Sequence, residues 1–196
     1  MNKPVHTGLL FGSFNPVHIG HLIIAHYFTE HQKMDEIWFV LSPQNPLKGS
    51  DELLGERERM ELLELAVAEN PKFRICDIEL GMPKPSYTID TIKQLKTAYP
   101  ERHFTLLIGS DNLAVFEKWK DHRAIPESIA INVYPRSFGF DHELLQHYNV
   151  HLVNAPLLEI SSTAIRKDVA AGKSPRYLVP EKVFERITAK SYYKRL

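Results

Sequence analysis

The sequence has a single cysteine, no excess of either charge and no long apolar run. Because Cys76 has no second cysteine to pair with, the chain cannot form an internal disulfide or a cysteine-rich zinc site, and it suits a reducing cytoplasm. Lysine plus arginine and aspartate plus glutamate number 24 each, which leaves no basic excess for broad nucleic-acid binding. No stretch reaches the length of a membrane span, and the opening MNKPVHTG lacks the apolar core of a signal peptide. We therefore expect a cytoplasmic protein whose partners include neither a membrane nor a nucleic acid.

Apolar runs and helix-like stretches alternate along the whole chain. Strands are predicted at 7–11, 36–41, 73–78, 104–108, 129–134 and 150–153, and helices at 18–32, 56–69, 89–98, 112–119, 162–171 and 181–194. Strands that alternate with helices indicate an α/β fold, with a doubly wound parallel sheet. The length of 196 residues predicts one domain over 1–196, with a helical C-terminal part from about 161.

The segment Gly12 to His21, GSFNPVHIGH, carries the strongest functional signal. It joins an apolar strand to an apolar-periodic helix, and glycine at the strand's exit lets the backbone approach a ligand closely. Pro16 presets a turn just before the first helical turn. His18 and His21 lie three apart, so they share a face at the helix end that favours an anion. The pattern predicts that two imidazoles bind a phosphate chain.

Two further segments are predicted to meet this loop. In a doubly wound sheet the first and fourth strands are neighbours, and ligands bind beyond their carboxyl ends. The fourth strand runs into Gly109, Ser110 and Asp111, which places Asp111 within reach of ribose hydroxyls. The segment 160–166, ISSTAIR, offers capping hydroxyls and Arg166 to a second anion site. Three phosphate-binding elements in one chain point to a nucleoside triphosphate.

These motifs resemble a known family. GSFNPVHIGH resembles the (H/T)xGH signature of the nucleotidyltransferase superfamily, and its longer form is similar to bacterial nicotinate-nucleotide adenylyltransferases. PSYTIDTI at 85–92, GSDNL followed by Trp119, ISSTAIR and YLVP at 177–180 match in the same order. The family commonly has a His-Lys pair after a proline in the loop beyond the second strand. This chain has Leu47 and Lys48 there, so the histidine is missing.

The resemblance implies a Rossmann-like nucleotidyltransferase fold and adenylyl transfer. The 5′-phosphate of nicotinate mononucleotide would attack the α-phosphorus of ATP, giving deamido-NAD and pyrophosphate, with Mg²⁺ carried by ATP and no resident metal site. It implies catalytic roles for His18, His21, Lys48 and Arg166. It implies ATP contacts by Gly12, Ser13, Phe14, Asn15, His18, His21, Gly109, Asp111, Ile160, Ser161, Ser162, Thr163 and Arg166. It implies contacts to the mononucleotide by Lys48, Tyr87, Thr88, Trp119 and Arg136, with Trp119 stacked on the pyridine.

Three alternatives stay open at this point. The acceptor could be nicotinamide mononucleotide or another superfamily substrate, such as phosphopantetheine or glycerol 3-phosphate. Residues 18–21 also spell the HIGH signature of class I aminoacyl-tRNA synthetases, although no residues remain for a tRNA-binding domain. The chain could instead be a non-catalytic nucleotide sensor, against which the retained histidines, Lys48 and Arg166 argue. The sequence is compatible with a homo-oligomer and leaves its size open.

Overall fold

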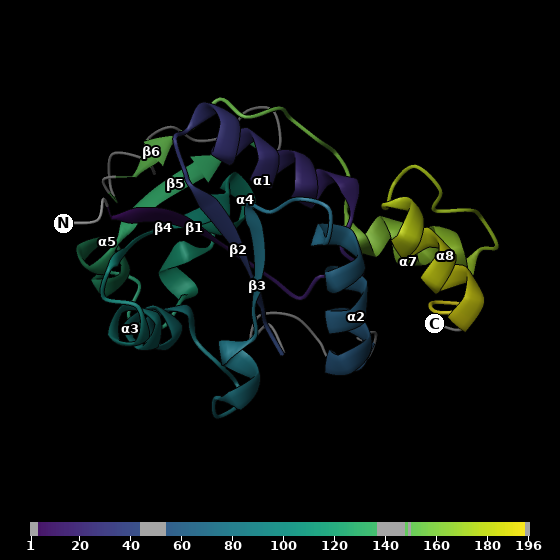
Figure 1. Cartoon of the computed structure of the whole chain (residues 1–196), viewed down its shortest axis with the longest axis horizontal. Coiled ribbons are helices and arrows are strands. Elements are labelled where there is room, and N and C mark those ends of the chain that lie inside the picture. The colour runs from purple at the N-terminus through teal and green to yellow at the C-terminus, as the bar shows by residue number, and fades with distance from the viewer. Residues whose placement is uncertain (1–3, 44–53, 137–147, 149, 195–196) are drawn as a thin grey trace.

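A six-stranded parallel sheet forms the centre of the protein (Figure 1). The computed structural model describes residues 4–43, 54–136, 148 and 150–194. The strand order is β3-β2-β1-β4-β5-β6, and every neighbouring pair is parallel. The strands are β1 (Val5–Gly12), β2 (Glu36–Leu41), β3 (Phe73–Cys76), β4 (Arg102–Gly109), β5 (Ala130–Tyr134) and β6 (His151–Leu152). The predicted α/β class and the neighbouring first and fourth strands are confirmed.

Helices cover both faces of the sheet. The longer ones are α1 (Ile19–His31), α2 (Glu56–Val67), α3 (Thr88–Ala98), α7 (Ser162–Ala170) and α8 (Glu181–Lys190). Shorter turns of helix are η1 (Ile78–Gly81), α4 (Ser110–Leu113), η2 (Phe116–Lys118) and α5 (Ala124–Ser128). In Figure 1, α7 and α8 lie together beyond α2, at the yellow end of the chain.

Successive side chains of the central strands enter two separate cores, because strand residues alternate between faces. Leu10, with Phe39 and Leu107 of the neighbouring strands, packs in the core that also contains residues of α1, α2, α7 and α8. Leu9, with Trp38 and Leu106, packs in the core that contains α3 and α5. All six residues of β2 are buried, which is typical of a central parallel strand covered on both sides.

Several predicted element boundaries are wrong. The predicted helix at 112–119 is instead the end of α4, a break at Ala114 and Val115, and then η2; Leu113 of α4 and Phe116 of η2 are both buried. The predicted third strand ends at Cys76 rather than 78, because the chain turns into η1. The last helix ends at Lys190, where Ser191 adopts a left-handed conformation (φ 52°).

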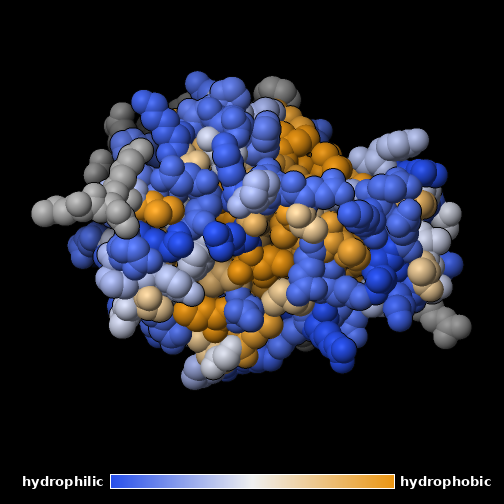
Figure 2. Space-filling view, in the orientation of Figure 1, coloured by the Kyte–Doolittle hydropathy of each residue, from blue (hydrophilic) through white to orange (hydrophobic). Residues whose placement is uncertain are grey.

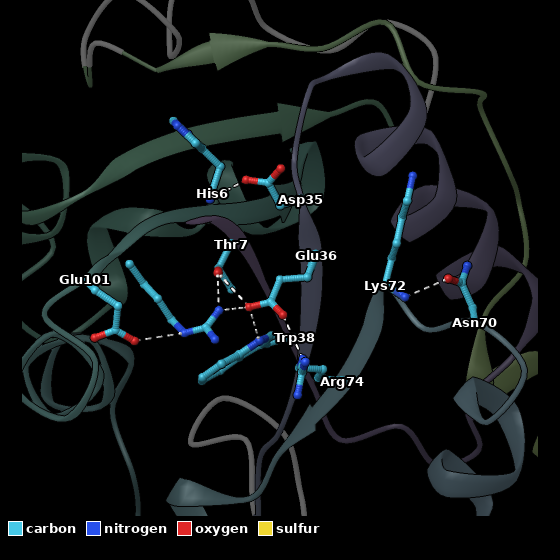
Figure 3. Close-up of polar contacts among 10 residues, drawn as sticks. His6, Thr7, Asp35, Glu36, Trp38, Asn70, Lys72, Arg74 and Glu101 are labelled. Carbon is cyan, nitrogen blue, oxygen red and sulfur yellow. Dashed lines mark hydrogen bonds and ion pairs between the residues drawn. The ribbon is translucent and has the colours of Figure 1, made fainter. Parts of the chain in front are cut away.

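A charged cluster closes the amino end of the sheet (Figure 3). Glu36 is 7% exposed and forms ion pairs with Arg102 and, at 2.7 Å, with Nε of Arg74. Its Oε1 also accepts hydrogen bonds from the Thr7 hydroxyl at 3.0 Å and from the Trp38 indole at 2.8 Å. One carboxylate thus joins four strands of the sheet at the end opposite the predicted ligand site.

Apolar side chains gather in the middle of the face shown in Figure 2, around β3 and α2, with hydrophilic residues about them. β3 is an outer strand of the sheet, and its Phe73 and Ile75 are only partly buried. None of the helices in the described parts of the chain is long and apolar enough to cross a bilayer.

Candidate active site

A cavity opens at the carboxyl ends of β1 and β4, where the sequence predicts ligand binding. Its wall includes residues from β1 and its exit loop, from the start of α3, and from the turn after β4. They are Phe11, Gly12, Ser13, Ser42, Glu79, Ser86, Tyr87, Thr88, Leu107, Ile108, Asn112, Lys118, Trp119, Lys120 and Tyr134. Five of the predicted site residues therefore meet around one cavity, namely Gly12, Ser13, Tyr87, Thr88 and Trp119.

The loop after β1 turns sharply over this cavity. Phe14 is almost completely buried and has a positive φ of 45°, a conformation that non-glycine residues seldom adopt. A Cβ on Gly12 would lie 3.0 Å from the Phe14 ring, so a larger residue there would require the buried ring to shift. Because the Phe14 ring packs against Phe39 and His21, Phe14 can offer a ligand only its backbone.

His18 and His21 stack at the start of α1. Their ring centroids are 3.7 Å apart with an interplanar angle of 26°, and His18 is the N-cap rather than the first helical residue. The backbone N–H of His18 donates to Nδ1 of His21 at 3.2 Å. Since Nδ1 of His21 accepts a hydrogen bond, the proton of the neutral ring is assigned to Nε2, where it can be donated to an anion.

His18 is a buried, neutral imidazole. It is 1% exposed, and its Nδ1 has no hydrogen-bond partner among the described residues. Burial, and to a smaller extent the positive charge of Arg136, lower the pKa of His18 to about 3. His18 therefore carries no positive charge near neutral pH in the ligand-free protein. The prediction that the pair grips a phosphate chain stays a prediction.

Four hydrogen bonds from the C-terminal part fasten the loop after β1. The Arg166 guanidinium donates to the carbonyl of Asn15 at 3.0 Å, and the Tyr193 hydroxyl donates to Asn15 Oδ1 at 3.0 Å. The Ser162 hydroxyl donates to the carbonyl of Pro16 at 2.9 Å, and the backbone N–H of Ile19 donates to Leu178 at 2.9 Å. The side chain of Asn15 faces the interior at 0% exposure, and Arg166 is buried as well. Both predicted ATP ligands thus support the loop in the ligand-free protein.

Arg59 of α2 holds the same loop, although no motif in the sequence marks it as a site residue. Its side chain is 1% exposed, and its guanidinium donates to four carbonyls, those of Ser13 at 2.7 Å, Ser42 at 2.8 Å, Pro43 at 2.8 Å and Leu54 at 3.1 Å. No carboxylate of the described residues forms an ion pair with Arg59, although burial lowers its pKa. A guanidinium cannot be deprotonated in a protein, so a positive charge lies directly under the backbone of Ser13.

The turn after β4 brings the predicted ribose contacts together with Arg136. The Arg136 backbone N–H donates to Ser110 Oγ at 3.0 Å, and its Nε lies 4.0 Å from Oδ2 of Asp111. A Cβ on Gly109 would lie 2.6 Å from Cγ of Arg136, so only glycine fits there. Arg136 was predicted to contact the mononucleotide. It does not line the cavity described above, and its charge acts on His18.

The start of α3 and the segment after η2 form the outer wall of the cavity. Tyr87 is the N-cap of α3, and Trp119 is half-buried with its ring 5.2 Å from Phe116. Nζ of Lys120 lies 4.9 Å from the Tyr87 ring centroid and 2.9 Å from Asp90. Tyr134 also lines the cavity, and burial raises its pKa to about 12, so its hydroxyl stays protonated. Lys118, Lys120 and Tyr134 had no signal in the sequence, because only their positions in space relate them to the cavity.

The ISSTAIR segment caps α7 as predicted. Ser161 is the N-cap, and its hydroxyl accepts from the backbone N–H of Ala164 at 3.1 Å. Thr163 is exposed, and Ile160 lies near Gly20, where an added Cβ would be 3.6 Å from Cβ of Ile160. Lys48 lies outside the described residues. Within 4–43, 54–136, 148 and 150–194, no three His, Cys, Asp or Glu side chains group as metal ligands.

Comparison with known proteins gives one consistent result. A family model described as cytidylyltransferase-like matches residues 9–168. A protein of Cytophaga hutchinsonii named "probable nicotinate-nucleotide adenylyltransferase" is 50% identical over 95% of this chain and 97% of its own length. A protein of Bacteroides fragilis (strain YCH46) with the same name is 46% identical over 92% of this chain and 90% of its own.

Solved structures share the fold at lower identity. The nicotinic acid mononucleotide adenylyltransferase of Plasmodium falciparum complexed with NaAD covers 98% of both chains with a TM-score of 0.83 and 20% identity. The same protein complexed with APC gives a TM-score of 0.81 at 19% identity. At these identities the likeness establishes a common fold.

Proposed function

Because this chain belongs to the cytidylyltransferase-like family and, within it, to the nicotinate-nucleotide adenylyltransferases, we propose that it transfers the adenylyl group of ATP to nicotinate mononucleotide. The products are deamido-NAD and pyrophosphate, an activity of NAD biosynthesis. The observation that carries the proposal is the cavity that joins the loop of Gly12 and Ser13 to Tyr87, Thr88 and Trp119. We also place the enzyme in the cytoplasm, which suits the free, buried Cys76.

The reaction needs alignment and charge stabilisation, since the phosphate of the mononucleotide is itself the nucleophile. In an in-line transfer, negative charge develops on the oxygens around the α-phosphorus. The Nε2–H of His21 and the ring of His18 lie at the start of α1, where first-turn N–H groups add to the positive potential. Arg136, next to Ser110 and Asp111, supplies a cation on the same side.

The acceptor occupies the cavity in this proposal. Its pyridine ring stacks on Trp119, and its carboxylate meets the backbone N–H groups around Tyr87 and Thr88. Lys48 neutralises its phosphate from the loop beyond β2. The charge of Arg59 under Ser13 stabilises the phosphate of either nucleotide through the loop backbone.

Mg²⁺ reaches the site with ATP in this proposal. The described residues offer no set of three metal-ligating side chains, and Mg²⁺ commonly takes its ligands from substrate phosphates and water. When bound, the ion neutralises triphosphate charge, while the histidines and Arg136 act on the transferring group.

The test is pyrophosphate release from ATP with a panel of acceptors. Nicotinate mononucleotide, nicotinamide mononucleotide, phosphopantetheine and glycerol 3-phosphate are supplied separately at equal concentrations. The proposal expects the highest kcat/KM with nicotinate mononucleotide. A higher value for the amide would change the substrate and leave adenylyl transfer standing, whereas no release with any acceptor would indicate a nucleotide sensor.

A further inference from the structure

Glu79 is a buried carboxylate in the cavity wall that the proposed function does not use. It belongs to η1, is 2% exposed and lines the cavity beside Ser86 and Tyr87. No lysine or arginine of the described residues forms an ion pair with it. A carboxylate in such a place persists only when hydrogen bonds replace its lost water.

Two hydroxyls supply these hydrogen bonds. Ser86 Oγ donates to Oε2 of Glu79 at 2.9 Å, and Thr91 Oγ1 donates to Oε1 at 2.7 Å. Ser86 directly precedes Tyr87, the N-cap of α3, and Thr91 lies in the first turn, with its N–H bonded to the Tyr87 carbonyl at 3.1 Å. One carboxylate therefore holds the chain on both sides of the point where α3 begins.

We propose that Glu79 is a positioning residue that sets the preference of the site for a carboxylate-bearing pyridine over its neutral amide. This inference rests on the proposed function, in which the N–H groups at the start of α3 bind the ring carboxylate. The first N–H groups of a helix have no partner within the helix, so their direction depends on how the helix start is held. Charge-assisted hydrogen bonds are short and strong, so a displaced helix start weakens binding of the acid more than binding of the amide.

In this proposal the charge of Glu79 does not act directly on the acceptor. Both hydroxyl protons point at the carboxylate, which leaves the N–H groups of the helix start as the donors available to a ligand. Glu79 acts on the substrate through the position of residues 86–91.

An exposed ion pair at the same helix start provides a matched control. Asp90, in the first turn of α3, pairs with Lys120 at 2.9 Å, and the two side chains are 35% and 44% exposed. Such surface pairs contribute little. Asp90→Asn removes a carboxylate from the same turn without touching Ser86 or Thr91.

Kinetics with both pyridine nucleotides test the proposal. Glu79→Ala should raise the KM for nicotinate mononucleotide roughly tenfold, the scale of a small misplacement of binding groups, and lower the acid-over-amide ratio of kcat/KM by a similar factor. The KM for ATP should change less than about twofold, as it should for both substrates in Asp90→Asn. Glu79→Gln should keep most of the preference. Its amide oxygen accepts from Ser86 and its NH₂ donates to Thr91, whose hydroxyl then reaches the Tyr87 carbonyl 3.2 Å away.

Hydrogen–deuterium exchange reports the same role without substrate. In Glu79→Ala, amides of residues 86–92 should exchange faster than in the wild type, while those of β1 should not. If Glu79→Ala does not fold, Thr91→Val removes one of the two hydrogen bonds and should lower the preference in the same direction.

The outcomes separate this inference from the proposed function. A wild-type enzyme that does not adenylylate nicotinate mononucleotide overturns both. An active wild type whose folded Glu79→Ala and Thr91→Val variants keep the acid preference overturns the inference alone. A Glu79→Gln variant as impaired as Glu79→Ala would do the same, because it would assign the effect to charge instead of hydrogen bonding.

Discussion

At the amino end of the sheet the carboxylate of Glu36 lies between two arginines, whereas at the carboxyl end the carboxylate of Glu79 has two hydroxyl partners and no ion pair with any described residue. Arg59, a buried cation of the carboxyl end, is likewise held by carbonyls instead of a carboxylate. At the amino end, opposite charges are paired with each other inside the protein. At the carboxyl end, fixed dipoles hold each charge without a counter-ion, so the field of Arg59 remains available to a charged substrate, while Glu79 acts through the residues that it positions.

The largest expected effect concerns the neutral His18 at the carboxyl end. Its pKa is 6.5 when unfolded and about 3 when folded, so between these pH values the unfolded chain binds a proton that the folded protein does not. The free energy of unfolding should therefore fall as pH drops from 6.5 toward 3, with an upper limit of about 5 kcal/mol from this group. Above pH 6.5 both states are neutral, and the contribution is constant.

Urea unfolding at a series of pH values measures this effect, with His18→Asn as the control. The wild type should lose more stability than His18→Asn between pH 6.5 and 4. Parallel pH profiles for the two proteins would mean that His18 is not buried as a neutral ring.

Breaking the charge cluster at the amino end should affect stability without affecting activity. Glu36→Gln leaves Arg102, whose side chain is 17% exposed, without its main partner, and removing one member of a buried pair costs about 3–5 kcal/mol. Glu101→Gln is the matched control, because Glu101 contacts the same arginine at 3.5 Å but is 62% exposed. Below its melting temperature, Glu36→Gln should keep the wild-type kcat/KM, and a selective loss of kcat would contradict the division between the two ends.

At the carboxyl end, a change of His21 should affect activity without affecting stability. His21→Ala removes the Nε2–H donor and should lower kcat by about 10², the usual cost of losing one oxyanion donor. His26→Ala, on the exposed side of the same helix, should leave kcat unchanged. Steady-state kinetics with a melting curve for each variant separates the two effects, and near-normal turnover of His21→Ala would remove this residue from the catalytic group.

The smallest predicted effect concerns Trp119 and separates binding of nicotinate mononucleotide from binding of ATP. Trp119→Ala should raise the KM for nicotinate mononucleotide about tenfold and leave that for ATP nearly unchanged, because aromatic stacking contributes about 1–3 kcal/mol per base. Trp119→Phe should recover part of the loss. Equal increases in both KM values would show that Trp119 supports the fold of the site instead of the pyridine ring.

The sequence predicts the parts of this molecule that follow from local pattern. Apolar runs gave β2 with its observed bounds, and the neighbouring first and fourth strands followed from the usual winding of such a sheet. The segment 112–119 failed because Leu113 and Phe116 are spaced alike in an α-helix and in the tighter turns that the chain adopts. The short helix α5 was missed, since five residues with Pro126 inside them carry no helical periodicity.

Site residues could be predicted only where they belong to a recognised sequence motif. Tyr87, Thr88 and Trp119 were assigned by resemblance, and the structure brings them to one cavity with Gly12 and Ser13. Arg59 and Glu79 were missed, because a charged residue in a charged helix or beside a turn is usually solvated. Their burial depends on hydroxyls 7 and 12 residues away for Glu79 and on carbonyls 5 to 46 residues away for Arg59, and no periodicity reveals these.

The four hydrogen bonds between the C-terminal part and the loop after β1 also constrain the order of folding. Their partners lie 146 to 178 residues apart in the side-chain contacts of Ser162, Arg166 and Tyr193, among the longest separations that the chain allows. Contacts of such range form late, because a long loop must be closed first. During synthesis the strands β1 to β4 can pair well before residues 162–193 leave the ribosome, and the last of the four hydrogen bonds to the loop cannot form before Tyr193 has left it. A nascent chain should therefore acquire its sheet early and its nucleotide affinity only at the end.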